Sequence, residues 1–229
     1  REFATSTLVE FESEITGSKR ADYLNEKYKK LKKKLRKNLE YGCSLGSMVL
    51  KPYVSNGQLL IDIVKATNFF PTAYNSDEEC TAGIFVSRKV EGKYYFTRLE
   101  YHDLDVSTKK YTIVNKAYMS TNEELLGSEI SLKAVKEWSN IDPVVPINNV
   151  EKPLFGYFKI PLANTIDPDS PCGPSCYARA TKLIKEADKQ FSRLLWEFEA
   201  TEVAIDADPT ALQQSKTMNG QLGLPKLKE

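Results

Sequence analysis

A chain of 229 residues can bury one substantial hydrophobic core or two smaller ones. With 41% hydrophobic and 28% charged residues its composition is that of an ordinary globular protein, and no apolar run approaches the ~20 residues that a membrane span needs. The formal net charge of +1 conceals an uneven distribution, because basic residues gather early in the chain and acidic residues late.

The cysteine and histidine content argues against a disulfide framework and against a metal centre. Four cysteines are too few for a disulfide scaffold in a chain of this length. Cys172 and Cys176 are separated by Gly-Pro-Ser, a spacing unlike that of zinc-binding pairs, and the chain has one histidine. We therefore expect reduced thiols, a cytosolic setting during assembly, and no metal or other cofactor.

The first predicted helix runs from Ala21 to Leu39, after a polar arm over residues 1–17 that we expect to be extended. Its apolar face recurs at steps of three and four and comprises Leu24, Tyr28, Leu31, Leu35 and Leu39. Eight basic residues lie between Lys27 and Lys37. They form a solvated face, contact an acidic patch of a neighbouring subunit, or bind phosphates without sequence preference. For the last two alternatives, the candidates are Lys30, Lys33, Lys34 and Lys37.

A G-x-S-x-G pattern, Gly42-Cys43-Ser44-Leu45-Gly46, follows this helix. In serine hydrolases the motif needs a strand before the serine and a helix after it, whereas here the predicted order is helix and then strand. The only histidine, His102, falls in a predicted strand, where we expect a structural or exposed role. The glycines therefore predict a turn or a close backbone approach, and a hydrolase that uses Ser44 is the weakest alternative.

The middle of the chain is rich in short β patterns. Ser55-Asn56-Gly57 and Glu91-Gly92-Lys93 are hairpin-turn signals. The predicted strands are Met48 to Tyr53, Leu59 to Val64, Ile84 to Val86, Tyr94 to Thr97, Arg98 to His102, Tyr111 to Val114 and Ser128 to Lys133. A long irregular connection from Asp142 onward leads back to a helix. Without a βαβ rhythm or an internal repeat, this order favours an α+β fold.

The last predicted helix runs from Ser175, a possible N-cap, to Val203, about 40 Å at ~1.5 Å per residue. Its apolar stripe comprises Tyr177, Ala180, Ile184, Ala187, Phe191, Leu194 and Phe198. Its end carries five carboxylates and no basic residue between Glu197 and Asp208. Taken by themselves, these carboxylates predict a solvated helix end.

Three long runs carry a resemblance to a known family. They are ITGSKRADYLNEKYKK (residues 15–30), LEYGCSLGSMVLKPYVSNGQLLIDIVKATNFFPTAYN (residues 39–75) and the segment from Lys152 that begins KPLFGYFKIPLANTIDPDSPCGPSC. From roughly Thr7 to Leu212 the chain resembles the portal proteins, or minor capsid proteins, of tailed phages of Gram-positive hosts. The resemblance implies a ring of about twelve subunits at one capsid vertex, through which double-stranded DNA is packaged and released.

The resemblance also implies an organisation, an α+β fold in which long amphipathic wing and stem helices flank a β-rich clip insert. It assigns residues 1–58 to a wing-like helix and strand segment and 59–162 to a β-rich wing and clip region. Residues 163–212 become the stem and tunnel-proximal helices, and 213–229 a flexible tail or the end of a fragment. In this arrangement Glu199, Glu202 and Asp206 are the candidates for tunnel-facing carboxylates.

The expected function is structural and not enzymatic. The chain has no G-x-x-x-x-G-K-[ST] motif, so the ATP hydrolysis that drives packaging would belong to a partner. The implied partners are copies of this chain, the packaging ATPase (the terminase large subunit), head–tail connector proteins and capsid or scaffold proteins. DNA would pass non-specifically, and no membrane is involved. The implied location is the virion, after assembly in the host cytoplasm. The alternative is a minor capsid or tail-adaptor protein that binds partners without forming a DNA conduit.

Overall fold

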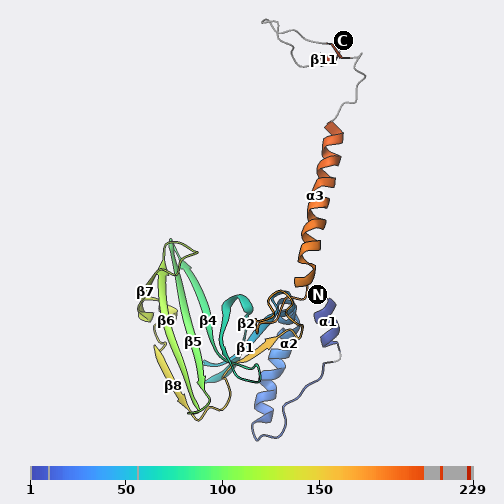
Figure 1. The fold of residues 1–229 in the computed structure, drawn as a ribbon. Helices are drawn as coiled ribbons and strands as arrows, with labels where there is room; N and C mark the ends of the chain where they lie inside the picture. The colour runs from blue at the N-terminus through green and yellow to red at the C-terminus, as the bar shows by residue number, and fades with distance from the viewer. Residues whose placement is uncertain (1, 10, 56, 204–211, 214–225, 228–229) are drawn as a thin grey trace. The chain divides into compact units, whose positions relative to one another are not determined.

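The computed structural model of the chain describes residues 2–9, 11–55, 57–203, 212–213 and 226–227. The chain divides into two compact units, Arg1–Arg179 and Ala180–Glu229, which are described separately below (Figure 1). No helix of the described residues combines the length and the apolarity that crossing a bilayer requires.

Two α-helices open the first unit. The helix α2 (Ala21–Leu45) has the predicted position and continues six residues beyond Leu39, and it buries Leu31 and Leu39. Residues 2–8 are not extended as predicted but form the short helix α1 (Glu2–Leu8). Ala4 of α1 is buried in one cluster with Leu39 and Cys43, so packing against α2 stabilises a helix that is too short to persist alone.

Nine strands form the body of the first unit, in two antiparallel sheets. In chain order they are β1 (Ser47–Ser55), β2 (Gln58–Lys65), β3 (Phe69–Tyr74), β4 (Cys80–Glu91), β5 (Tyr94–Asp105), β6 (Lys110–Ser120), β7 (Ser128–Ile130), β8 (Val144–Asn148) and β9 (Gly156–Lys159). The smaller sheet has the order β2-β1-β9, and the larger has the order β3-β4-β5-β6-β7 with β8 also paired to β6. Short 3₁₀ turns, η1 (Ala66–Asn68), η2 (Leu132–Ala134) and η3 (Lys136–Trp138), connect these strands.

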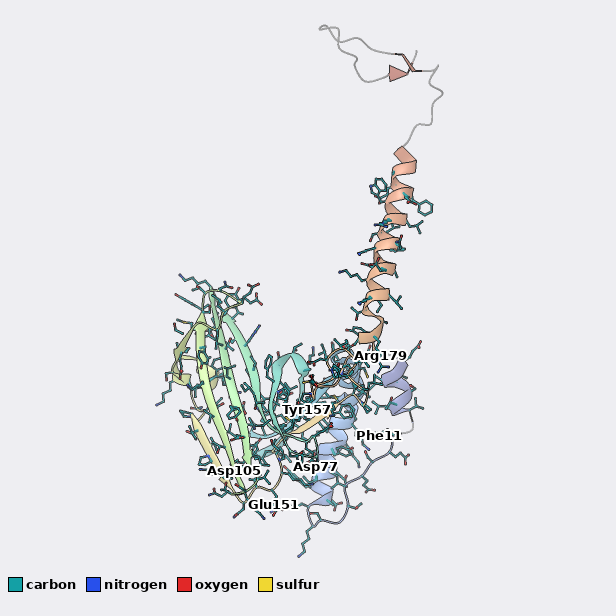
Figure 2. All side chains as sticks on the ribbon, in the orientation of Figure 1. Phe11, Asp77, Asp105, Glu151, Tyr157 and Arg179 are labelled. Carbon is teal, nitrogen blue, oxygen red and sulfur yellow. The ribbon has the colours of Figure 1, made fainter. Side chains whose placement is uncertain are left out.

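The three long strands β4, β5 and β6 are the framework of the larger sheet (Figure 1). One face of this sheet is covered in two places. Towards the smaller sheet, Phe69, Phe85, Tyr111 and Phe155 form an aromatic core together with Val49 of β1. Further along, the apolar side chains around η2 and η3 cover the same face, in a cluster of Phe96, Ala117, Leu132, Val135 and Trp138. Tyr157 of β9, labelled in Figure 2, completes the first core with its ring centroid 5.6 Å from that of Phe69.

The predicted fold class, with long amphipathic wing and stem helices flanking a β insert, is wrong. The first unit is built on two antiparallel sheets, and the described residues contain three α-helices. Two physical reasons explain the error. Half-buried strands lack a regular alternation of apolar and polar residues, so the single strand β5 resembles two short strands in the sequence. The strands β3, β8 and β9 contain Pro71, Pro146 and Gly156, which lower strand propensity, but pairing with β4, β6 and β1 overrides that preference.

Gly46 ends α2 and brings a distant loop onto the helix. Its φ of +88° is left-handed, and its N–H donates to Gly42 O at 2.7 Å. A β-carbon at Gly46 would lie 2.1 Å from Gly173 O. The backbone N–H of Cys176 donates to Cys43 O, and that of Ile160 to Gly46 O, both at 2.9 Å. The sequence-based prediction of a turn or a close approach at these glycines is therefore confirmed at Gly46.

The second unit contains the helix α3 (Thr181–Val203) and the short antiparallel pair β10 (Leu212–Gln213) and β11 (Lys226–Leu227). The helix begins later than predicted, because η4 (Ala178–Ala180) precedes it as a 3₁₀ turn. Ser175 accordingly is not its N-cap. The Ser175 side chain instead accepts a hydrogen bond from Tyr177 N–H at 3.4 Å, within the preceding turn.

Candidate functional site

A buried carboxylate, Glu100 of β5, contacts two cationic side chains and a histidine. Lys51 Nζ lies 2.6 Å from Glu100 Oε1, and Arg98 Nη2 lies 2.9 Å from Oε2. His102 Nε2 lies 2.8 Å from Oε1. Because Arg98, Glu100 and His102 alternate along β5, they share the face of the strand that packs on the smaller sheet, and Lys51 reaches them from β1. These residues and Tyr111 are called the charged cluster below.

The protonation states in the charged cluster follow from its contacts. Burial alone would raise the pKa of Glu100, but the hydrogen bond from His102 and the charges of Lys51 and Arg98 outweigh it and lower the pKa to about 2. Burial lowers the pKa of His102, against the opposing pull of Glu100. Neutral His102 therefore donates its Nε2–H to Glu100, and Nδ1 accepts from the hydroxyl of Tyr111 at 2.7 Å.

These contacts leave His102 without the geometry of a general base for Ser44. Both ring nitrogens are engaged by Glu100 and Tyr111. Ser44 lies in the last turn of α2, and its hydroxyl donates to Tyr41 O at 2.9 Å. The helix precedes the serine and the strand β1 follows it, the reverse of the order in a nucleophile elbow. The G-x-S-x-G pattern is the end of a helix.

A groove of about 690 Å³ opens beside the charged cluster. Four cations and two carboxylates line it, a net of two positive charges, and they are Lys51, Lys65, Arg88, Arg98, Asp62 and Glu100. Its apolar lining includes Val64 of β2 and Phe85 of β4. The whole groove lies within the first unit, between β2 and β4. We call it the β2–β4 groove.

The four lysines proposed from the sequence as a basic face lie exposed on α2. Lys30 pairs with Glu26 of the preceding turn at 3.2 Å. Lys33, Lys34 and Lys37 are exposed and, among the described residues, have no ion-pair partner. The remaining bases of this segment are partly used within the protein, since Lys32 donates to Ser13 O at 3.0 Å and Arg36 to Thr5 Oγ1 at 3.0 Å. The helix thus keeps a solvent-facing cationic strip, called the basic face of α2.

The three predicted tunnel carboxylates are described only in part. Glu199 is exposed on α3. Glu202 belongs to the helix, but its side chain lies outside the described residues, as does the whole of Asp206. The predicted grouping of these three side chains therefore lies largely outside the described residues.

The predicted apolar stripe of α3 is present and open to solvent. Ile184 is 53% exposed, Phe191 59% and Leu194 47%. The neighbouring side chains Leu183 and Trp196 are exposed as well. Figure 2 shows the side chains of α3 projecting on every side of the helix. Apolar side chains at such spacing normally pack against another surface. The exposed stripe of α3 is therefore suited to binding another protein surface.

Sequence analysis missed the charged cluster. The spacing of Arg98, Glu100 and His102 was a usable signal, because three ionisable residues on one face of a strand between aromatic neighbours are costly unless they are paired. No signal linked Lys51 to them, since it lies in a separate strand pattern. A scan against protein-family models and a search of curated proteins found no match to this chain.

Proposed function

We propose that this chain is a structural subunit that assembles with copies of itself through α3. The assembly we propose is the portal ring of a tailed phage, a conduit for double-stranded DNA at one capsid vertex. The observation that carries the proposal is the exposed stripe of Ile184, Phe191 and Leu194. The identity of the assembly rests on the resemblance of the three sequence runs quoted above.

The free energies of burial and association favour a closed ring over a simple dimer. These three side chains are already about half buried, so burying the rest of their surface contributes roughly 2–5 kcal/mol. Association costs on the order of 4–15 kcal/mol in lost freedom, so a single α3 interface would be weak. In a ring each subunit has two interfaces, and closure with cyclic symmetry satisfies every copy. We therefore expect few small oligomers and one closed species.

The charged surfaces have roles in this proposal. The basic face of α2, with Lys30, Lys33, Lys34 and Lys37, would contact an acidic surface of a neighbouring subunit or the DNA phosphates. Glu199, Glu202 and Asp206 would face the conduit, where carboxylates weaken adhesion to DNA. The packaging ATPase (the terminase large subunit), head–tail connector proteins and capsid or scaffold proteins would dock on the ring, in the virion or during assembly in the host cytoplasm.

The second candidate is a minor capsid or tail-adaptor protein that binds partners without forming a conduit. The β-rich architecture of the first unit favours it, because the resemblance implies a ring built mainly from long helices. The two candidates differ in what α3 does. In an adaptor, the stripe would bind a different chain, and the purified protein would not close into rings.

Native mass spectrometry of three proteins tests the proposal. The wild-type chain should give one closed oligomer of fixed copy number. Phe191→Asp should give monomers with an unchanged urea midpoint, since Phe191 is already exposed in the single chain. Lys185→Asp, on the same helix but off the stripe, should assemble like the wild type. A monomeric wild type would favour the adaptor, and a Phe191→Asp protein that still assembles would show that α3 is not the interface.

A further inference from the structure

The strand β4 has a free edge beside the β2–β4 groove. Its first half pairs with β3 on one side, as far as Phe69 opposite Phe85. Its second half, Val86 to Glu91, pairs with β5 on the other side alone. In an antiparallel ladder every second residue directs its N–H and C=O to the same side, so alternate residues of this half carry backbone groups that have no partner within the described residues.

The groove runs along this edge and extends onto the inner face of the sheet, where Arg98 and Glu100 of β5 line it. Consecutive residues from Phe85 to Arg88 line it. Because neighbouring residues of a strand point to opposite faces, only a groove that runs along the edge contacts all of them. The turn η1 separates β2, which lines one side of the groove, from β3, which pairs with the first half of β4.

The opposite wall is the edge of β2, and that edge is already capped. Consecutive residues from Asp62 to Lys65 line this wall. The N–H of Leu59 donates to the hydroxyl of Tyr23 at 3.3 Å, and the N–H of Ile63 donates to Asp62 Oδ1 at 2.9 Å. Side chains thus occupy donors of β2, whereas the donors of β4 beyond Phe85 have no such cap among the described residues.

We propose that the β2–β4 groove binds an extended acidic peptide segment of a partner protein, which adds a strand to the free edge of β4. Backbone hydrogen bonds to Val86–Glu91 would hold the strand, as in β-augmentation. Lys65 and Arg88, the exposed cations of the groove, would select carboxylate side chains, and Val64 and Val86 would contact its apolar residues. This inference does not depend on the proposed ring.

Charge complementarity favours an acidic peptide over nucleic acid. Lys51 and Arg98 are already paired with Glu100, so the exposed charges of the groove are those of Lys65, Arg88 and Asp62. The carboxylate of Asp62 would repel a continuous row of phosphates. Charged residues at a strand edge also oppose pairing between copies of the same chain. Arg88 has no ion-pair partner among the described residues, so a partner's carboxylate is a suitable counter-ion.

A blocked octapeptide of alternating glutamate and valine is the first probe, titrated into the full chain by fluorescence anisotropy. We expect it to bind, and a lysine–valine octapeptide and an N-methylated glutamate–valine octapeptide not to bind. Arg88→Glu should weaken binding about fivefold or more, the size of one exposed ion pair. Lys133→Glu, an exposed cation on η2 away from the groove, should leave binding unchanged.

Amide hydrogen exchange of the labelled chain supplies the second readout. Bound peptide should protect alternate amides from Val86 to Glu91, whereas ion pairing alone would leave them unprotected. The proposal is overturned if the glutamate–valine peptide does not bind, if the lysine–valine or the N-methylated peptide binds equally well, or if binding leaves these amides unprotected. It is equally overturned if a short DNA duplex displaces the peptide at the groove. Protection that appears without peptide as the protein concentration rises would assign the edge to a second copy and also refute it.

Discussion

Glu100 stabilises three neighbouring polar side chains that would otherwise be costly to bury. Lys51 and Arg98 are each largely buried, and both direct their charge to this carboxylate. Their desolvation is offset only while Glu100 stays ionised between them. The ion pair between Glu100 and Lys51 therefore links β5 of the larger sheet to β1 of the smaller one. The charged cluster stabilises the packing of the two sheets.

Glu100→Gln should lower the free energy of unfolding by about 3–5 kcal/mol, because it leaves two buried cations with one neutral acceptor. Glu129→Gln is the matched control. Glu129 also pairs with a lysine, Lys116 at 3.1 Å, but both side chains are more than half exposed, so the loss should be below about 1 kcal/mol. Urea denaturation of both variants measures the difference. Equal losses in the free energy of unfolding would show that the buried ion pairs of Glu100 stabilise the protein no more than an exposed one.

His102 should make the stability depend on pH between about 5.5 and 7. Its pKa is lowered by burial, so the unfolded chain takes up a proton first as pH falls through the ordinary value near 6.5. Stability therefore falls as pH falls, by at most about 1.4 kcal/mol per pH unit. The contribution of Glu100 is lost only at lower pH, between 4.5 and about 2.

His102→Gln provides the control for this pH effect. The chain has a single histidine, so the variant should lose the slope of stability between pH 5.5 and 7 while keeping an amide donor for Glu100. Urea unfolding at the two pH values measures it. A slope that persists unchanged in the variant would mean that His102 is not buried in its neutral form.

Sequence analysis placed His102 correctly in a strand but did not find its partners. Arg98, Glu100 and His102 are spaced by the two-residue period of a strand, so the sequence alone predicts that they share one face. Lys51 and Tyr111 belong to other strands, and only the pairing of β5 with β6 and the packing of the sheets bring them within hydrogen-bonding distance. Such contacts depend on tertiary structure, which local patterns do not encode.

Among the elements, the end of α2 depends most strictly on residue type. Gly46 has a left-handed backbone, and Gly173 of a distant loop contacts it directly. The glycines of this segment were a local signal, and they correctly predicted a break in the helix. The identity of the approaching loop was not predictable, because it arrives more than a hundred residues later in the chain.

Gly46→Ala should cost roughly 2–5 kcal/mol, through the left-handed backbone and the overlap of the new methyl group with Gly173 O. Gly57→Ala is the matched control. Gly57 also has a positive φ, of +71°, but nothing lies within 4 Å of its would-be β-carbon, so only about 1–2 kcal/mol should be lost. Thermal or urea unfolding separates the two, and equal losses would argue against the close approach at Gly46.

The types of individual elements were predicted better than the relative amounts of helix and strand. The helix from Ala21, the hairpin of β1 and β2, and the long strands around Tyr94 and Tyr111 lie where sequence patterns placed them. The patterns were too short, and they omitted the strands that only pairing stabilises. The fold-class error follows from that omission, because summing the missed strand residues turns a β insert into the main body of the unit.

For the whole molecule, the contrast between the two units is the central feature. The first unit closes its own cores between two sheets, whereas α3 exposes its apolar stripe. The sequence predicted the stripe itself but not its exposure, and a stripe of this kind equally fits packing within the chain. The exposed stripe makes association the function that α3 is best suited to perform.

Electron microscopy of the full-length protein tests the central claim most directly. Class averages should show closed rings of one size, with an open axis wide enough to admit a DNA duplex, and Phe191→Asp should abolish the rings while Lys185→Asp preserves them. Isolated particles in the wild type, or rings with a closed axis, would contradict the account.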